Sequence, residues 1–288
     1  MKRNPYRIEG PALVSFSGGR TSGYMLKHII DAHDGTLPGD VHVTFANTGK
    51  EKMPETLDFV AECASRWGVR IVWLEWRDKA VSDDGAAFEI VSHNSASRNG
   101  EPFMALIRKK GYLPNPITRF CTIELKIRVM RDYARSLGWD HWTNVIGLRA
   151  DEPTRVARSR SNRDRWDNSM PLADAGVARA HITAFWARQG FDLRLPNSDG
   201  TTPLGNCDLC FLKGGATLLG IIRDQPELAQ WWAEAEAEAR ASKPLGARFR
   251  KDRPGYAAML NLTQSQGDLF AGMPDWADHD TKPCGCHD

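Results

Sequence analysis

The first third of the chain alternates between short apolar runs and segments with helical periodicity. Each apolar run has the length of one buried strand and ends in small or polar residues. Between the first two runs, Met25 and Ile29 mark an apolar stripe at one-turn spacing, and a second helix is predicted over 54–67, with proline at its first position. Alternation of this kind is typical of a parallel sheet covered by helices. The predicted strands span 11–16, 41–45 and 69–74.

The pattern changes beyond this first third. Residues 77–100 are polar, which predicts a loop over a site, and residues 142–148 predict a fourth strand. Residues 151–165 have weak apolar periodicity, and roughly the last 40 residues are expected to be loop-like. We therefore expect an α/β fold, a parallel sheet with helices on both faces, formed by a domain over 1–176 with a C-terminal helical part over 177–288 packed on it. Further helices are predicted at 102–111, 123–137, 178–189, 214–223 and 226–242.

Composition narrows the class of protein without specifying its chemistry. The chain has 288 residues, with 38 Lys and Arg against 36 Asp and Glu, and this near balance argues against generic binding of polyanions. A mean hydropathy of −0.46 and the lack of a long apolar run exclude a membrane span, and we expect no secretory signal and a cytoplasmic location. In a reducing compartment the six cysteines are expected to be thiols, some able to hold a metal.

The strongest local signal lies where the first strand meets the first helix. The segment Ser17–Ser22 reads SGGRTS, and its two adjacent glycines let the backbone turn tightly and present N–H groups. Its hydroxyl groups add donors, and the N-terminus of the following helix adds positive partial charge. This combination predicts a cradle for phosphate or pyrophosphate. It is not a G-x-x-x-x-G-K-[ST] loop, and a tight turn capped by serine or threonine is the alternative.

The segment Ser17–Ser22 resembles the pyrophosphate loop, SGGxDS, of the PP-loop ATP pyrophosphatases and the phosphoadenosine phosphosulfate (PAPS) reductase family. Four further segments resemble that family in the same order, between residues 12 and 214. They are Asn47–Gly49 with Pro54–Thr56 (family D-T-G-x-x-x-P-E-T), Cys121 with Lys126 (C-x-x-x-K), Gly147 with Arg149, Glu152 and Arg155 (G-x-R-x-x-E-S-x-x-R), and Gly205–Cys210 (G-C-x-x-C).

The resemblance implies an adenine nucleotide α-hydrolase-like, Rossmann-like fold whose domain 1–176 binds ATP, or a related adenine nucleotide, together with Mg²⁺. It also implies that Arg149 and Arg155 act on the phosphates or the leaving group. The nucleotide contacts that it implies are Ser15, Ser17, Gly18, Gly19, Arg20, Thr21, Ser22, Asn47, Thr48, Gly49, Lys126 and Gly147.

Two departures from the family pattern and one retained glycine bear on the expected reaction. Thr21 stands where nucleotide-activating members carry aspartate, and Asn47 replaces an aspartate, so it can contact a nucleotide but cannot ligate a metal by charge. Gly19 is retained, whereas sulfonucleotide reductases usually lose this second glycine. The retained glycine favours intact ATP and cleavage between its α- and β-phosphates.

The cysteines form a second candidate site. Cys207 and Cys210 have the C-x-x-C spacing at which two thiolates can bind one metal. Iron–sulfur members of the family combine such a pair with an earlier cysteine pair, of which only Cys121 is present here. Cys121, Cys207 and Cys210 would then hold a [4Fe–4S] cluster with one open iron, or Cys284 or Cys286 would complete it. Zinc and a metal-free dithiol remain open alternatives. Cys63 is predicted to be a small buried residue of the helix 54–67.

Two further segments keep several interpretations. The tail Cys284-Gly285-Cys286-His287 resembles the terminal E-C-G-[IL]-H of the family's reductases, whose cysteine attacks a sulfonate sulfur. Cys284 is therefore a nucleophile, a ligand or a free thiol. Residues 149–165 hold six arginines against three acids, which suits phosphate oxygens, a nucleic-acid backbone or a solvated loop.

Three functions follow as hypotheses. The leading one is a PP-loop enzyme that adenylylates an acceptor and then transfers sulfur with the help of an iron–sulfur cluster, similar to DNA phosphorothioation-type sulfurtransferases. A nucleic-acid acceptor or partner subunits fit this reading. The second is a sulfonucleotide reductase that uses Cys284. The third is a nucleotide-binding regulatory subunit without turnover.

Overall fold

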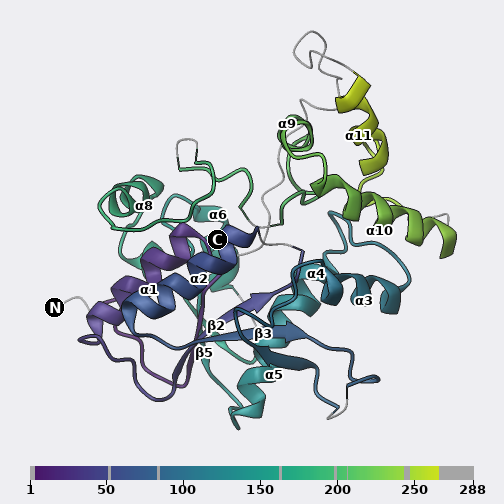
Figure 1. Ribbon diagram of the computed structural model, residues 1–288. Helices are drawn as coiled ribbons and strands as arrows, with labels where there is room; N and C mark the ends of the chain where they lie inside the picture. The colour runs from purple at the N-terminus through teal and green to yellow at the C-terminus, as the bar shows by residue number, and fades with distance from the viewer. Residues whose placement is uncertain are drawn as a thin grey trace.

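The fold of this chain is a parallel sheet with helices on both faces. The computed structural model describes residues 4–50, 53–82, 85–161, 164–197, 200–205, 207–242 and 247–265. Within these ranges six strands form one sheet in the order β4-β3-β2-β1-β5-β6, and only the edge pair β3–β4 is antiparallel (Figure 1). The predicted α/β class is therefore confirmed. The strands are β1 (Ala12–Ser15), β2 (Val41–Asn47), β3 (Ile71–Trp76), β4 (Phe88–Val91), β5 (Thr143–Val145) and β6 (Asp167–Ser169).

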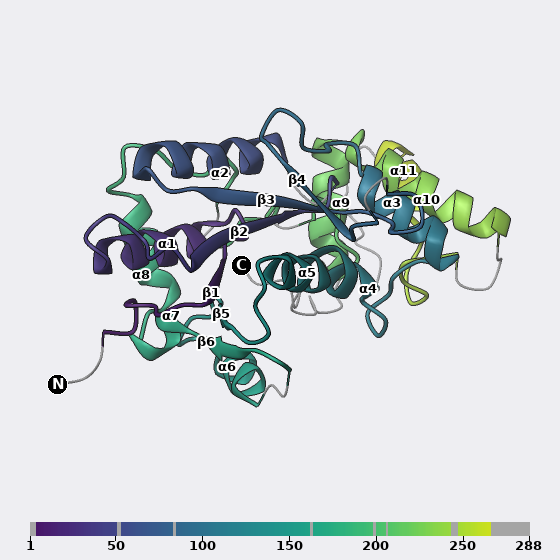
Figure 2. The ribbon, with the colours of Figure 1, turned by 90° about the horizontal axis from the view of Figure 1, so that it is seen from below.

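Helices cover the sheet because its central strands are apolar on both faces. β1 and β3 are buried at every position, and Figure 2 shows α2 and α5 on opposite sides of the sheet. The helices before β5 are α1 (Arg20–Ala32), α2 (Pro54–Trp67), α3 (Glu101–Lys110), α4 (Phe120–Thr122), the π-helix η1 (Ile123–Arg128) and α5 (Val129–Ser136). Those after β5 are α6 (Pro153–Arg160), α7 (Pro171–Asp174), α8 (Arg179–Trp186), α9 (Gly215–Asp224), α10 (Leu228–Ser242) and α11 (Tyr256–Ser265).

The strand order places the loop after β1 at a topological switch. The chain leaves β1 for β2 on one side, whereas β5 pairs with β1 on the other. Loops that follow β1 and β5 therefore run apart at their carboxyl ends, which leaves room for a ligand between them. The segments 16–19 and 146–152 border this space.

The structure differs from the sequence-based elements at several places, and the edge strand β6 is one element that was not predicted. β4 lies inside the predicted loop 77–100, α6 lies inside the arginine-dense segment, and α11 lies in the segment expected to be loop-like. Each is short and half-exposed, so its own periodicity is weak, and neighbouring elements define it. The predicted helix 123–137 divides into η1 and α5, a π-helical start that apolar spacing does not signal.

The C-terminal helices α9, α10 and α11 lie beyond one end of the sheet (Figure 1). They pack around a buried aromatic cluster. Trp232 stacks on Tyr256 and lies edge-on to Phe249, and all three are almost fully buried. In contrast α8, which follows the predicted boundary at 176, packs on α1 through an indole hydrogen bond from Trp186 Nε1 to the Arg20 carbonyl oxygen (2.8 Å). The division into 1–176 and 177–288 stays a prediction. Across the part of the chain that the structure describes, no helix is both long and apolar enough to cross a membrane.

Candidate functional site

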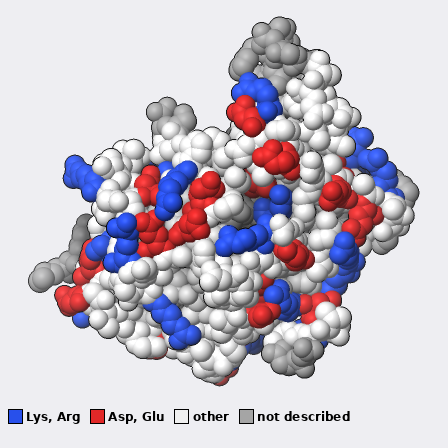
Figure 3. All heavy atoms as spheres, viewed as in Figure 1, with Lys and Arg blue, Asp and Glu red and all other residues white. Residues whose placement is uncertain are grey.

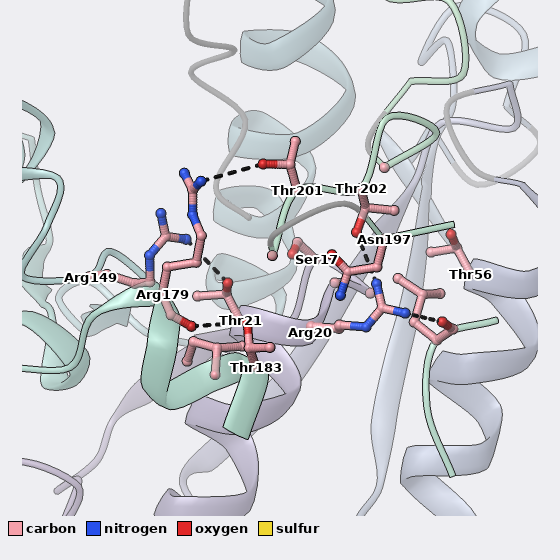
Figure 4. Close-up of a pocket in the computed structure, with 16 residues that line it drawn as sticks. Ser17, Arg20, Thr21, Thr56, Arg149, Arg179, Thr183, Asn197, Thr201 and Thr202 are labelled. Carbon is pink, nitrogen blue, oxygen red and sulfur yellow. Dashed lines mark hydrogen bonds between the residues drawn. The ribbon is translucent and has the colours of Figure 1, made fainter. Parts of the chain in front are cut away.

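A pocket of about 170 Å³, called the phosphate pocket below, lies at the switch point (Figure 4). The loop after β1 forms one side of it, and Arg149 comes from the loop after β5. The opposite side comes from α8 and from the loop before Cys207. Its lining residues are Ser17, Gly18, Gly19, Arg20, Thr21, Thr56, Arg149, Arg179, Ile182, Thr183, Leu193, Asn197, Gly200, Thr201, Thr202 and Gly205.

Glycine is required where the loop turns. Gly18 has φ = +79°, and a Cβ there would lie 2.7 Å from Thr56 Cγ2, so α2 approaches the loop too closely for any side chain. Ser22 holds the turn from inside the helix: its Oγ lies 3.0 Å from Ser17 Oγ and donates to the Gly19 carbonyl oxygen (2.9 Å). The first amide groups of α1 have no helical acceptors, as at any helix start. This loop can therefore receive phosphate oxygens.

Arg149 is held toward the loop by its own neighbours. Its side chain is buried, its Nε donates to Asp151 (2.9 Å), and its Nη1 donates to Thr21 Oγ1 (3.3 Å). Burial opposes ionisation of Asp151, but the Arg179 amide and the Arg149 guanidinium together lower the pKa of that carboxyl. A cation fixed in this way at the loop suits a bound phosphate.

Arg179 is the site residue that sequence reasoning missed. It begins α8, its backbone N–H donates to Asp151 (3.1 Å), and its Nη1 lies 3.4 Å from Thr201 Oγ1 (Figure 4). Nothing in its local sequence signals a ligand contact, because α8 reads as an ordinary short helix. Only the packing of α8 on α1 brings this guanidinium to the pocket.

Arg20 lies at the pocket but gives most of its donors to the protein. Its guanidinium forms two hydrogen bonds with Asp192 (2.7 and 2.8 Å) and one with Thr202 Oγ1 (2.9 Å). It also donates to the backbone carbonyl groups of Leu193 and Leu195. Arg20 therefore anchors the loop that closes the pocket, a role that the resemblance did not imply.

Asn47 ends β2 beside a fully buried carboxylate. Its Nδ2 donates to Glu75 (2.7 Å) and to the Ser97 carbonyl oxygen (2.9 Å), and its Oδ1 accepts from the Gly49 amide (3.2 Å). Glu75 accepts further hydrogen bonds from the backbone and hydroxyl of Ser97. An aspartate at position 47 would face this carboxylate, which explains why an amide stands here. Thr48 is buried next to it.

The remaining nucleotide candidates lie outside the phosphate pocket. Ser15 faces the other side of the sheet, 3.3 Å from Asn144 Oδ1, and Lys126 lies in η1. Gly147 is buried between β5 and Arg149. Arg155 pairs with Glu152 and lines a different cavity. Their roles toward a nucleotide stay predictions.

Three of the predicted cysteine ligands, Cys121, Cys207 and Cys210, lie among the residues that the structure describes. Cys207 and Cys210 are buried, and Cys121 is half-buried. Nowhere in the described ranges do three or more His, Cys, Asp or Glu side chains form a group able to hold a metal ion. Cys284 and Cys286 lie outside the residues that the structure describes. Cys63 lies in the core as predicted, and burial raises the pKa of its thiol.

Buried charges hold the Cys207–Cys210 segment against the loop after β2. Asp208 is 2% exposed, accepts from Trp232 Nε1 (2.8 Å), and lies 3.1 Å from the ammonium group of Lys50. Burial raises the pKa of Asp208, and the Lys50 charge opposes this shift. Tyr256 donates to the Leu209 carbonyl oxygen (2.6 Å). The segment therefore has a fixed position relative to the end of β2.

Charges on the surface are mixed. Figure 3 shows basic and acidic side chains interspersed over the viewed face, as the near balance of charge in the sequence suggests. On this face the basic side chains do not gather into one large patch.

Comparisons with known proteins give two phage relatives and several solved structures, of which one is a tRNA thiolase. The nin region protein ORF290 of Escherichia phage lambda is 28% identical over 283 residues, which cover 94% of this chain and 92% of that protein. A 37.8 kDa protein from the gpa 5′ region of Escherichia phage 186 is 29% identical over 171 residues, about half of each chain. The U34-tRNA thiolase NcsA from Methanococcus maripaludis, solved with its [4Fe–4S] cluster, matches with a TM-score of 0.41 and 12% identity over 93% of this chain and 77% of that one. No protein-family model matches the chain.

Proposed function

We propose that this chain binds ATP, or a related adenine nucleotide, through its phosphates and transfers AMP to an acceptor with release of pyrophosphate. The phosphate pocket carries this proposal. The glycine turn at the start of α1 faces Arg149 and Arg179 across it, and no carboxylate is found among its described lining residues. Such a lining brings donors and positive charge to a phosphate from two sides, while the carboxylates that pair with Arg149, those of Asp151 and Glu152, lie outside the lining.

The proposed step exchanges one P–O bond for another. An oxygen of the acceptor forms a bond to the α-phosphorus, and the bond from that phosphorus to the oxygen bridging to the β-phosphate breaks. The bridging oxygen leaves with the electron pair as part of pyrophosphate. Arg149, Arg179 and the first amides of α1 stabilise the charge that grows there. Mg²⁺ fits as an ion carried in by the phosphates, because it needs few protein ligands.

Sulfur transfer is the further part of the proposal. A sulfide-level sulfur from a donor would form a bond to the acceptor atom while the bond from that atom to the AMP-bearing oxygen breaks, and AMP leaves with that oxygen and its electron pair. Cys121, Cys207 and Cys210 would hold a [4Fe–4S] cluster that supplies or positions that sulfur. Because the three thiols do not form a ligand group in the structure, no step is assigned to the cluster. Zinc is the competing occupant.

The direct test measures pyrophosphate and AMP with Mg²⁺ and ATP, after ATP affinity has been measured by calorimetry. The variant Arg179→Ala removes one charged donor from the pocket, and ATP should bind about 10- to 100-fold more weakly. Arg188→Ala removes an exposed arginine just beyond α8 and should leave ATP affinity within about twofold.

Three results would replace the proposal. Equal ATP affinity in both variants would show that the phosphates bind elsewhere. Tight ATP binding without cleavage, tested with nucleic-acid acceptors, would favour a regulatory subunit. Sulfite release from PAPS that is lost in Cys284→Ser would identify a sulfonucleotide reductase. Iron, sulfide and zinc analysis after anaerobic purification decides the metal separately.

A further inference from the structure

A second cavity, of about 440 Å³, lies under β1, β5 and β6 and is called the arginine cavity below. Its volume falls within the range of roughly 300–1,000 Å³ that is typical of small-molecule sites. The η1–α5 segment forms one wall and α6 the other. The arginine cavity shares no lining residue with the phosphate pocket. The two linings are nevertheless close along the chain, because Ser15 and Leu148 line the cavity, whereas Ser17 and Arg149 line the pocket.

The lining of the arginine cavity is mixed, with two indoles and two asparagine amides beside aliphatic side chains. Trp142 and Trp166 stack on each other with ring centroids 5.3 Å apart, and both line the cavity. Asn168 also lines it: its Nδ2 donates to the Ser159 carbonyl oxygen (3.0 Å), but its buried Oδ1 accepts no hydrogen bond from any described residue. This oxygen is closed off from solvent in the structure, so an N–H group of a ligand would reach it only after a neighbouring side chain moves.

The rim of the cavity is basic. Four arginines, at positions 119, 131, 155 and 158, line it together with a single acid, the exposed Asp164. Arg131 pairs with Asp132 and Arg155 with Glu152, whereas the guanidinium groups of Arg119 and Arg158 have no partner among the residues that the structure describes. The rim can therefore bind an anionic group of the ligand.

We propose that the arginine cavity binds a nucleotide unit separate from ATP, with its base against Trp142, Trp166 and Asn168 and its phosphate at the arginines. A planar base with N–H donors matches the aromatic and amide lining. ATP whose phosphates occupy the phosphate pocket would bring no charge to this rim. The guanidinium groups of Arg119 and Arg158, which have no partner among the described residues, therefore favour a second ligand that carries its own phosphate. This nucleotide is the acceptor, a role that rests on the proposed transfer of AMP.

The test uses nucleoside 5′-monophosphates as probes, titrated by calorimetry into protein saturated with a nonhydrolysable ATP analogue. One further equivalent of at least one of AMP, GMP, CMP and UMP should bind. Arg158→Glu should weaken this binding at least tenfold, and Trp166→Ala should weaken it about tenfold, as expected for lost base stacking. The matched control is Arg160→Glu on the same helix, where the arginine pairs with Asp174 outside the cavity and affinity should change less than about twofold.

Two outcomes would overturn the proposal. If the analogue displaces the monophosphate, the cavity holds part of the same nucleotide. If none of the four probes binds, or Arg158→Glu and Arg160→Glu have equal effects, the cavity is not a nucleotide site. Arg179→Ala separates this result from the proposed function, because it should weaken binding of the analogue and leave the monophosphate unaffected.

Discussion

Replacing Gly18 with alanine tests whether the phosphate loop is shaped by its contact with α2. The residue has φ = +79°, and a non-glycine residue in this region costs about 1–2 kcal/mol. The new Cβ would also lie 2.7 Å from Thr56 Cγ2 and 3.1 Å from Val60 Cγ2, and crowding of a packed interior costs about 1–3 kcal/mol. We therefore expect Gly18→Ala to lower the free energy of unfolding by about 2–5 kcal/mol, the sum of these two costs.

Gly35 provides the matched control. It has φ = +90°, and a Cβ there would meet nothing within 4 Å, so Gly35→Ala should show only the backbone cost of about 1–2 kcal/mol. Urea unfolding followed by far-UV circular dichroism measures both variants. Thr56→Ser removes the contacting methyl group, so the double variant with Gly18→Ala should recover part of the loss relative to the sum of the single changes. Equal losses at Gly18 and Gly35, together with no coupling to Thr56, would refute the reasoning.

Three further predictions concern charges near the site. Asn47→Asp places a second carboxylate against buried Glu75, so it should lower the free energy of unfolding by about 3 kcal/mol at pH 7. That loss should shrink as the pH falls and one carboxylate is protonated, and a loss that does not vary between pH 4 and 7 would contradict the reasoning. Asp208→Ala leaves the Lys50 ammonium and the Trp232 indole N–H without their partner, so it should cost about 3–5 kcal/mol in urea unfolding. The double variant Lys50→Met/Asp208→Leu should cost less, and an equal cost would show that the ion pair is not responsible. The lowered pKa of Asp151 means that its contribution to stability is present above the unfolded value near 3.8 and is lost as the pH falls through the folded value. The difference in unfolding free energy between wild type and Asp151→Asn should then be constant from pH 6 to 8 and decrease below pH 4. A difference that grows in acid would contradict this prediction.

Local patterns were sufficient for the elements that lie across the middle of the sheet. β1, β2 and β3 are apolar runs bounded by turn residues, and α1 and α2 bury one face each, so periodicity identifies them. The short edge strands β4 and β6 and helix α6 were missed. Each has few buried residues, so pairing with a neighbour rather than its own composition defines it.

The residues of the candidate site likewise include some that local sequence predicts and others that only long-range contacts bring there. Adjacent glycines and hydroxyls between a strand and a helix predict a phosphate loop, because turn geometry and the helix N-terminus depend on neighbouring residues alone. The contribution of Arg179, the anchoring of Arg20 by Asp192 and the pairing of Asn47 with Glu75 join residues 28 to 172 positions apart. No local pattern contains such pairs.

The sequence by itself therefore determined the α/β class, the turn after β1 and the residue types at that turn, because backbone conformation and amphipathic periodicity are local properties. The tertiary structure decided which side chains reach the phosphate pocket and which serve the fold. It directed Arg149 to the pocket and Arg155 to the arginine cavity, although the two stand six positions apart on one segment. The physical reason is that α6 begins between them, so the packing of that helix separates the two guanidinium groups.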